Sequence, residues 1–160
     1  MRWIWIDRFE TFTPGKAATA VKAVTAAEDH LHDLYPAFPI FPHSLIVEGF
    51  AQTAGILVGE AGGFKEKVIL AKLGKADFER LVRPGDVLRY EATLDTFGPA
   101  GASCSGRVSV GDDTVATISM MFSHIDQNMS GLGFPEHNFV FTDQFLELLD
   151  GVRRNDAVAI

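Results

Sequence analysis

The hydrophobic pattern divides the chain into one long apolar stretch followed by a series of short alternating ones. Residues 44–59 are apolar on nearly every side of a helical projection, which predicts a buried helix rather than an amphipathic one. Pro42 near the first turn and Ser44 as a capping residue predict where this helix begins. Its polar exceptions, Ser44, Glu48 and Gln52, are spaced by four and therefore form one stripe on one face.

Shorter segments on both sides of this helix alternate between apolar and polar residues, which is typical of strands with one buried face. We expect strands at 17–25, 68–78, 87–97, 102–110 and 114–125. Pro-Gly and Gly-Asp pairs between them predict tight turns. Because the last strands follow one another across short turns, they must be antiparallel. A segregated helix and antiparallel strands predict an α+β fold.

Two further segments do not follow either period. Pro36, Pro39 and Pro42 are spaced by three and predict a stiff extended loop before the helix. Beyond a domain at 1–125, residues 126–160 are expected to be a C-terminal extension packed on the same domain. It should contain a linker, a possible strand at 138–141, and a helix at 142–149 with Thr142 as N-cap and Gly151 at its C-terminal end.

Composition and charge narrow the class of protein. A length of 160 residues favours a single domain, and the net charge of -7 argues against non-specific binding to nucleic acid. The one cysteine, Cys104, cannot form an intramolecular disulfide, which fits a reducing compartment. The longest apolar run is shorter than the ~20 residues of a membrane span, and no signal peptide precedes it. We therefore expect a cytoplasmic protein.

Three blocks of residues resemble one known family. The match opens with Ile6-Asp7-Arg8, Pro14-Gly15-Lys16, Val24-Thr25 and Glu28. Residues 36–42 followed by Leu45-Ile46-Val47-Glu48-Gly49-Phe50-Ala51-Gln52 form its centre. Lys75-Ala76 and Pro84-Gly85-Asp86 make up the third block. Together they resemble the (3R)-hydroxyacyl-[acyl-carrier-protein] dehydratases over about residues 6–125 in one register. The central block is the specific part of the match.

The resemblance implies a hot-dog fold, in which a curled sheet wraps around the long helix, and a homodimer with two sites at the subunit interface. It also implies a reaction without a cofactor. A histidine of one chain takes the α-proton of a 3-hydroxyacyl thioester, and a helix carboxylate of the other chain protonates the departing hydroxyl. Such chemistry needs a matched base and acid in a dry tunnel.

When the family pattern is carried over residue by residue, Glu48 occupies the position of the helix carboxylate. The position of the catalytic histidine holds Leu34, which cannot accept a proton. His43 stands where the family has a glycine whose backbone N–H faces the thioester carbonyl, and a histidine keeps that N–H. We therefore consider two candidates for the base. One is the His43 side chain, acting across the interface of a dimer, and the other is a water molecule. Glu48 alternatively is a buried polar residue bonded to Gln52.

His30, His32 and Asp33 form a histidine-rich run that is common without a metal, so no metal site is predicted. In the family register either histidine could approach the site, and we rank both below His43. We expect Ser44, Gln52, Leu34, Phe38 and Phe41 to contact substrate, although plain core packing is the preferred explanation for the phenylalanines.

Seven of the 14 basic residues lie between positions 65 and 89. A basic pocket mouth would suit an acidic acyl carrier protein or the phosphates of coenzyme A, and a solvated sheet edge explains these residues equally well. Three functions remain open: a 3-hydroxyacyl thioester dehydratase with Glu48 as acid, a hot-dog thioesterase in which Glu48 activates water, and a non-catalytic acyl-thioester binding protein. Leu34 is the feature that separates the first from the other two.

Overall fold

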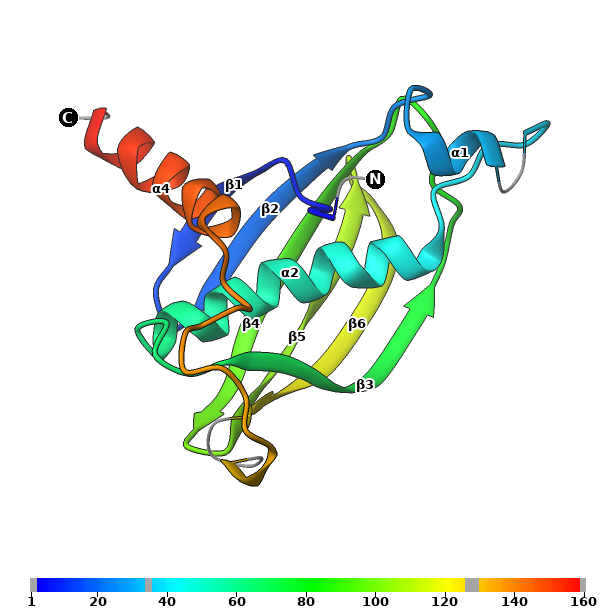
Figure 1. Ribbon diagram of the computed structural model, residues 1–160. Coiled ribbons are helices and arrows are strands. Elements are labelled where there is room, and N and C mark those ends of the chain that lie inside the picture. Colours follow the sequence, from blue (N-terminus) through cyan, green and yellow to red (C-terminus); the bar gives the residue numbers. More distant parts are fainter. Residues whose placement is uncertain (1–2, 34–35, 126–129, 159–160) are drawn as a thin grey trace.

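The computed structural model describes residues 3–33, 36–125 and 130–158 (Figure 1). The sheet has six antiparallel strands in the order β1-β2-β4-β5-β6-β3. The helices and strands, in chain order, are β1 Arg8–Thr13, β2 Ala17–Ala23, α1 Asp29–Asp33, α2 His43–Ala61, β3 Val68–Phe78, β4 Val87–Gly98, β5 Gly101–Val110, β6 Asp113–His124, the 3-10 turn η1 Ser130–Leu132 and α4 Asp143–Val158. The curled sheet wraps around α2, which confirms the predicted α+β hot-dog architecture.

The helix α2 fills the centre of the molecule because its apolar side chains meet the sheet on several sides. Ile46, Phe50 and Leu57 are completely buried. At Gly49 a side chain would lie 2.5 Å from the ring of Tyr90 and 3.0 Å from the backbone oxygen of Trp5, so only glycine permits this approach of helix, sheet and N-terminal segment.

The start of α2 differs in one respect from the prediction. Pro42 is the N-cap and makes no side-chain capping bond, and its backbone oxygen accepts from the N–H groups of Leu45 and Ile46 at 3.0 and 3.2 Å. Ser44 therefore does not cap the helix, because it already lies within the first turn. Its side chain is exposed.

The strands β2 to β6 match the predicted segments to within two residues at each end. No strand is expected at β1 from the hydrophobic pattern, and the structure shows why. A bulge between Phe9 and Thr11 breaks the period of two. Phe9 and Phe12, three positions apart, consequently pack their rings edge to face at 5.3 Å.

The two edges of the sheet differ. The helix α4 packs against β1, whereas β3 forms the opposite edge and is exposed along most of its 11 residues. Leu70 and Leu73 on β3 are 41% and 43% exposed. None of the helices in the described part of the chain has both the length and the apolar composition needed to cross a membrane.

The C-terminal extension differs from the prediction in two details. Residues 138–141 are not a strand, because the Asn138 side chain organises them as a turn, accepting from Val140 N at 3.0 Å and donating to Phe64 O at 3.1 Å. The helix α4 continues past Gly151 to Val158. A glycine inside a helix costs only about 1 kcal/mol, and burial of Val152 beyond it continues the apolar face.

Candidate functional site

The polar stripe of α2 is held by a network of hydrogen bonds to the N-terminal segment. Gln52, which is buried, donates from Nε2 to Glu48 Oε1 and to the backbone oxygen of Trp3, both at 2.9 Å. Its Oε1 accepts from the backbone N–H of Trp5 at 2.7 Å. The predicted contact between positions 48 and 52 is therefore present, and the amide also ties α2 to the segment that crosses it.

This network gives the Glu48 carboxylate a fixed orientation. Glu48 is half-buried, and one of its oxygens is held by Gln52. A carboxyl group anchored through one oxygen can present the other to a ligand and exchange a proton there. The arrangement is thus suited to an acid or to activation of a water molecule.

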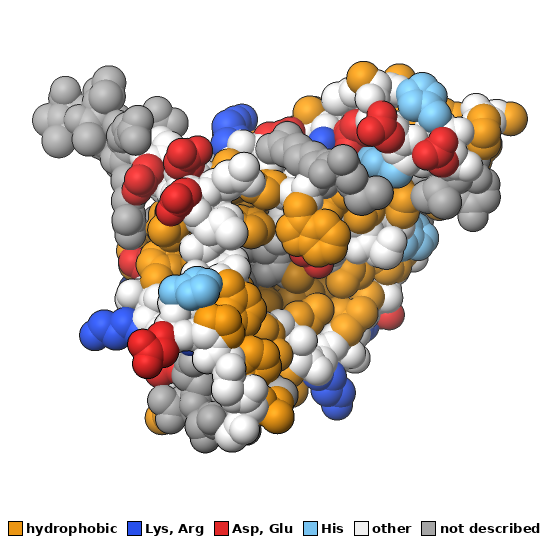
Figure 2. Space-filling view, in the orientation of Figure 1, with side chains coloured by type: hydrophobic (Ala, Val, Ile, Leu, Met, Phe, Trp, Pro, Cys, Tyr) orange, Lys and Arg blue, Asp and Glu red, His pale blue; other side chains and the backbone are white. Residues whose placement is uncertain are grey.

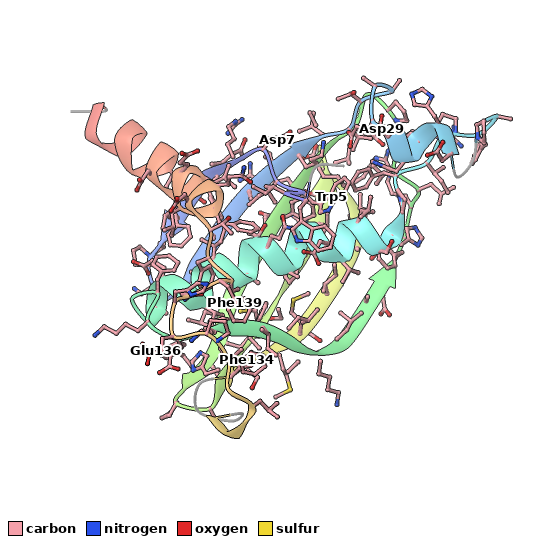
Figure 3. The ribbon with its side chains drawn as sticks, in the orientation of Figure 1. Trp5, Asp7, Asp29, Phe134, Glu136 and Phe139 are labelled. Atoms are coloured by element: carbon pink, nitrogen blue, oxygen red, sulfur yellow. The ribbon has the colours of Figure 1, made fainter. Side chains whose placement is uncertain are left out.

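A cavity of about 700 Å³ lies beside the first turn of α2. Its walls come from the N-terminal segment, the end of β2, the region of α1 and the start of α2, including Trp5, Lys22, His30 and Ser44. Figure 3 shows Trp5 in front of the N-terminal half of α2 and Asp29 at α1. Figure 2 shows acidic and histidine side chains gathered at the α1 end of this face, beside a broad hydrophobic surface. Glu48 lies one helical turn beyond Ser44.

His30 is enclosed by aromatic rings at this cavity. Its ring packs edge to face against Trp5 and Phe41, with centroids 5.3 Å away in both cases. Only 14% of its side chain is exposed, and burial lowers its pKa below the usual value, against the opposing effect of Glu28. Burial therefore favours the neutral form of the His30 imidazole.

Glu28 stands next to His30 in a fixed position. Its Oε1 accepts from the backbone N–H of Thr25 at 2.9 Å and from Lys22 Nζ at 3.0 Å, while its Oε2 lies 3.9 Å from Nε2 of His30. The Thr25 hydroxyl in turn accepts from the N–H of Ala27. Sequence reasoning gave this carboxylate no role, although a threonine followed three residues later by glutamate is the signature of a capping box.

The structure places His43 away from Glu48. The His43 ring is exposed and stacks on Phe78, with centroids 3.9 Å apart and planes 4° apart. No hydrogen bond or ion pair joins it to Glu48 among the described residues. A separation of five positions turns the two side chains about 140° apart around the helix, which accounts for this.

The remaining candidate residues have different environments. Phe41 is buried in the core, whereas Phe38 is 48% exposed, with the Arg83 guanidinium 4.3 Å from its ring centre. Leu34 lies outside the described residues. No group of three or more potential metal ligands comes together in the described part of the chain.

Most of the basic residues between positions 65 and 89 are engaged in the fold. Arg80 pairs with Asp86 at 3.0 Å and with Asp113 at 3.4 Å, and Lys75 pairs with Asp77 at 2.8 Å. Arg89 pairs with Glu10, and Lys67 is buried. These ion pairs leave a smaller cationic surface than the residue count suggests.

Residues 3–119 match the model of the FabA-like domain. The chain belongs to the FabA-like family. The match begins at the segment that bonds Gln52 and ends within β6, so it includes every residue of the Glu48 network and of the cavity described above. It excludes the C-terminal extension.

Similar proteins include dehydratases and a thioesterase. A protein described as 3-hydroxyacyl-[acyl-carrier-protein] dehydratase FabZ from a Thermoanaerobacter species is 37% identical over 121 residues, which are 75% of this FabA-like chain and 85% of the relative. Among solved structures, the dehydratase heterocomplex ApeI:P of Xenorhabdus doucetiae has a TM-score of 0.64 at 14% identity, covering 76% of this chain and 83% of that one. A hypothetical thioesterase with coenzyme A from Streptococcus pneumoniae has a TM-score of 0.59 at 9% identity, covering 72% and 83%. These two structures show the fold alone.

Proposed function

We propose that this FabA-like protein is a lyase that dehydrates 3-hydroxyacyl thioesters, with Glu48 as the proton donor. The observation that carries the proposal is the anchored carboxyl group, because Gln52 fixes one oxygen of Glu48 and leaves the other for the substrate. Membership of the FabA-like family and the FabZ relatives support the reaction class. The relatives' name also suggests a place in fatty-acid-type lipid biosynthesis.

In the proposed reaction, the C2–H bond of the substrate breaks and its electron pair forms the C2–C3 double bond. The C3–O bond breaks at the same time or afterwards, and a protonated Glu48 donates its proton to the departing hydroxyl, so that water leaves. A base must accept the C2 proton, and solvent later restores both groups. Proton transfer by a positioned residue is worth about 10²–10⁴ in rate.

The start of α2 offers a donor for the thioester carbonyl. The first N–H of this helix to bond back to the chain is that of Leu45, so the N–H of His43 precedes the intrahelical ladder. A helix N-terminus stabilises the negative charge that develops on the carbonyl oxygen as the proton leaves C2. His43 is thus proposed to act through its backbone, and its side chain remains a candidate base only across a subunit interface.

A second copy of the chain is the partner we expect at the β3 edge. No strand of the described residues pairs with the outer side of β3, and the apolar side chains of Leu70 and Leu73 are exposed there. Such an edge is a template for pairing with another strand. We therefore propose a homodimer through β3, with acyl thioesters of acyl carrier protein or coenzyme A as substrates. Phe38 and Ser44 are proposed contacts for the acyl thioester.

Thioester hydrolysis is the alternative function. Leu34 stands where the family pattern has the histidine that serves as the base for elimination, so that base is missing. Hydrolysis requires only a water molecule activated by Glu48. The hypothetical thioesterase with coenzyme A that shares this fold supports the alternative. A non-catalytic acyl-thioester binding protein would keep the cavity and lose both activities.

The test compares hydration of a crotonyl thioester with hydrolysis of a saturated acyl thioester, using wild type, Glu48→Gln, His43→Ala and Leu34→His. We expect wild type to hydrate the crotonyl thioester and Glu48→Gln to lose about 10²–10⁴ of that rate. His43→Ala should retain the activity if only the backbone of that residue is used.

Hydrolysis without hydration would favour the thioesterase. An inert wild type combined with hydration by Leu34→His would indicate a binding protein derived from a dehydratase. An unchanged rate in Glu48→Gln would exclude the proposed site.

A further inference from the structure

We propose that His30, which has the Glu28 carboxylate beside its Nε2, is the catalytic base that removes the C2 proton. This inference rests on the proposed function, because it supplies the group that position 34 lacks. It assigns the role to a residue on α1 rather than to His43 at the start of α2.

The first support is the arrangement of the two ring nitrogens. Nε2 of His30 is buried, has no hydrogen-bond partner among the described residues, and lies 3.9 Å from Oε2 of Glu28. In the proposal, Nδ1 is the ring nitrogen that accepts the proton from a ligand in the cavity that His30 lines. A carboxylate behind one nitrogen stabilises the imidazolium that forms when the other nitrogen takes a proton.

The second support is that Glu28 cannot turn away. Its Oε1 is fixed by the backbone N–H of Thr25 and by Lys22, whose side chain is only 6% exposed. Oε2 therefore remains on the side of His30. The rings of Trp5 and Phe41 hold the imidazole plane from two directions. A pre-oriented pair of this kind is what general-base catalysis requires.

The third support is the position of the cavity relative to Glu48. The cavity is lined by Ser44, which precedes Glu48 by one helical turn on the same stripe. It is also lined by Trp5, whose N–H is bonded to Gln52, the residue that follows Glu48 by one turn. Ser44 is thus the residue of the polar stripe that lines the cavity, and Gln52 is joined to the cavity wall through its hydrogen bond to Trp5. In the sequence, His30 lies four residues before position 34, where the family pattern has its catalytic histidine.

In the inferred step, the C2–H bond breaks and the proton moves to Nδ1 of His30, giving an imidazolium next to the Glu28 carboxylate. The electron pair of that bond becomes the C2–C3 double bond, and the hydroxyl leaves as water with the proton of Glu48. His30 then returns its proton to solvent, and Glu48 takes one up. Burial lowers the pKa of His30 and so favours the neutral imidazole, which is the form that can accept a proton.

The first measurement is hydration of a crotonyl thioester by wild type, His30→Asn and His30→Phe, with His32→Asn as the matched control. His32 lies on the same short helix and is exposed. The phenylalanine keeps the ring packing against Trp5 and Phe41 and removes both nitrogens. We expect both His30 variants to lose about 10²–10⁴ of kcat, while His32→Asn stays within about threefold of wild type.

The second measurement tests the role of the base separately from that of the acid. A butyryl thioester has no 3-hydroxyl, so exchange of its C2 hydrogens in D₂O needs a base and no proton donor for a leaving group. Mass spectrometry should show exchange by wild type and by Glu48→Gln. His30→Phe should show none, while circular dichroism shows the wild-type fold.

The outcomes separate the two proposals. Hydration that persists in His30→Phe overturns the inference and leaves the proposed function intact. No hydration in wild type, combined with C2 exchange that depends on His30, overturns the proposed function and supports His30 as a base. If wild type shows neither activity, both are wrong.

Discussion

The two ends of α2 have similar apolar sequences but very different surroundings. At the N-terminal end, Ser44 is exposed, Glu48 is half-buried, and a cavity of about 700 Å³ adjoins the first turn. At the C-terminal end, Leu57 and Val58 are fully buried. There a side chain at Gly59 would lie 2.3 Å from the ring of Phe141, so the C-terminal extension packs directly on that end, which we call the sealed end.

The difference shows that one helix can provide both stability and chemistry when separate segments cover its two halves. The open end is bounded by residues 3–7 and α1, which lie inside the family match. The sealed end is covered by a segment beyond residue 119, outside that match. We therefore expect changes at the sealed end to lower stability without altering chemistry, and changes at the open end to do both.

The largest expected effect on stability is that of Phe141→Ala at the sealed end. The side chain is 9% exposed and packs on Gly59 and edge to face on Phe64 at 5.1 Å. Removing a buried phenylalanine costs about 3–5 kcal/mol. Urea denaturation should show this loss of unfolding free energy, while kcat for crotonyl-thioester hydration should remain within about twofold.

A double-mutant cycle with Gly59→Ala tests the same contact between α2 and Phe141. Alone, the added methyl group should clash with the Phe141 ring and destabilise the protein by about 1–3 kcal/mol. Combined with Phe141→Ala, it fills part of the vacated space, so the two losses should not add. Additive losses, or a large fall in kcat for either variant, would contradict a purely structural role of the sealed end.

Gln52→Ala tests the open end and should have the next largest effect. It removes three hydrogen bonds at once, leaving the Trp5 N–H without its acceptor and Glu48 without its anchor. A buried group left unsatisfied costs about 1–3 kcal/mol. We expect a loss of about 2 kcal/mol in unfolding free energy, and a fall in kcat that exceeds any change in KM.

Thr53→Ala is the matched control. Thr53 is the next residue on α2, is fully buried, and donates from its hydroxyl only to the backbone oxygen of Gly49 within its own helix. Its loss should cost no more than about 1.5 kcal/mol and leave kcat unchanged. Equal kinetic effects of the two variants would mean that the Gln52 network is not specific to Glu48.

Elements that a local pattern determines could be predicted from the sequence. Contacts between segments that are distant in the sequence could not. The periods of two and 3.6 located β2 to β6 and α2, and a spacing of four brought Glu48 and Gln52 together. No spacing could show that Gln52 bonds Trp3 and Trp5, nearly fifty positions away, or that Phe141 packs against Gly59. The stacking of His43 on Phe78 depends likewise on where β3 ends beside α2.

At the open end, we expect His30 to make the unfolding free energy depend on pH, and this effect should be smaller than that of Gln52→Ala. Its pKa in the folded protein lies below the unfolded value of about 6.5, so just below that pH the unfolded state binds the extra proton. Stability therefore rises with pH through this window and is lost as the pH falls. Glu28 and Asp29 on the α1 side and Lys22 on β2 are the charged groups that act on the ring, and Lys22 acts in the same direction as burial.

The test compares the unfolding free energy of wild type and His30→Phe at pH 7.5 and pH 5.5. The phenylalanine variant should lose less stability than wild type on acidification, and His32→Asn should behave as wild type. An identical pH dependence in wild type and His30→Phe would show that the ring is not held in its neutral form.

Tyr90→Phe is expected to have the smallest effect, and it tests how tightly α2 is packed between its two ends. Tyr90 is fully buried beneath Gly49, and its hydroxyl has no hydrogen-bond partner among the described residues. Burial raises its pKa far above the usual value, so it stays protonated. Removing an unsatisfied hydroxyl removes a desolvation penalty, so phenylalanine should be neutral or stabilising by about 1 kcal/mol. A loss of stability in thermal unfolding would instead show that the hydroxyl is bonded in solution, and that the middle of α2 shares the polar character of its open end.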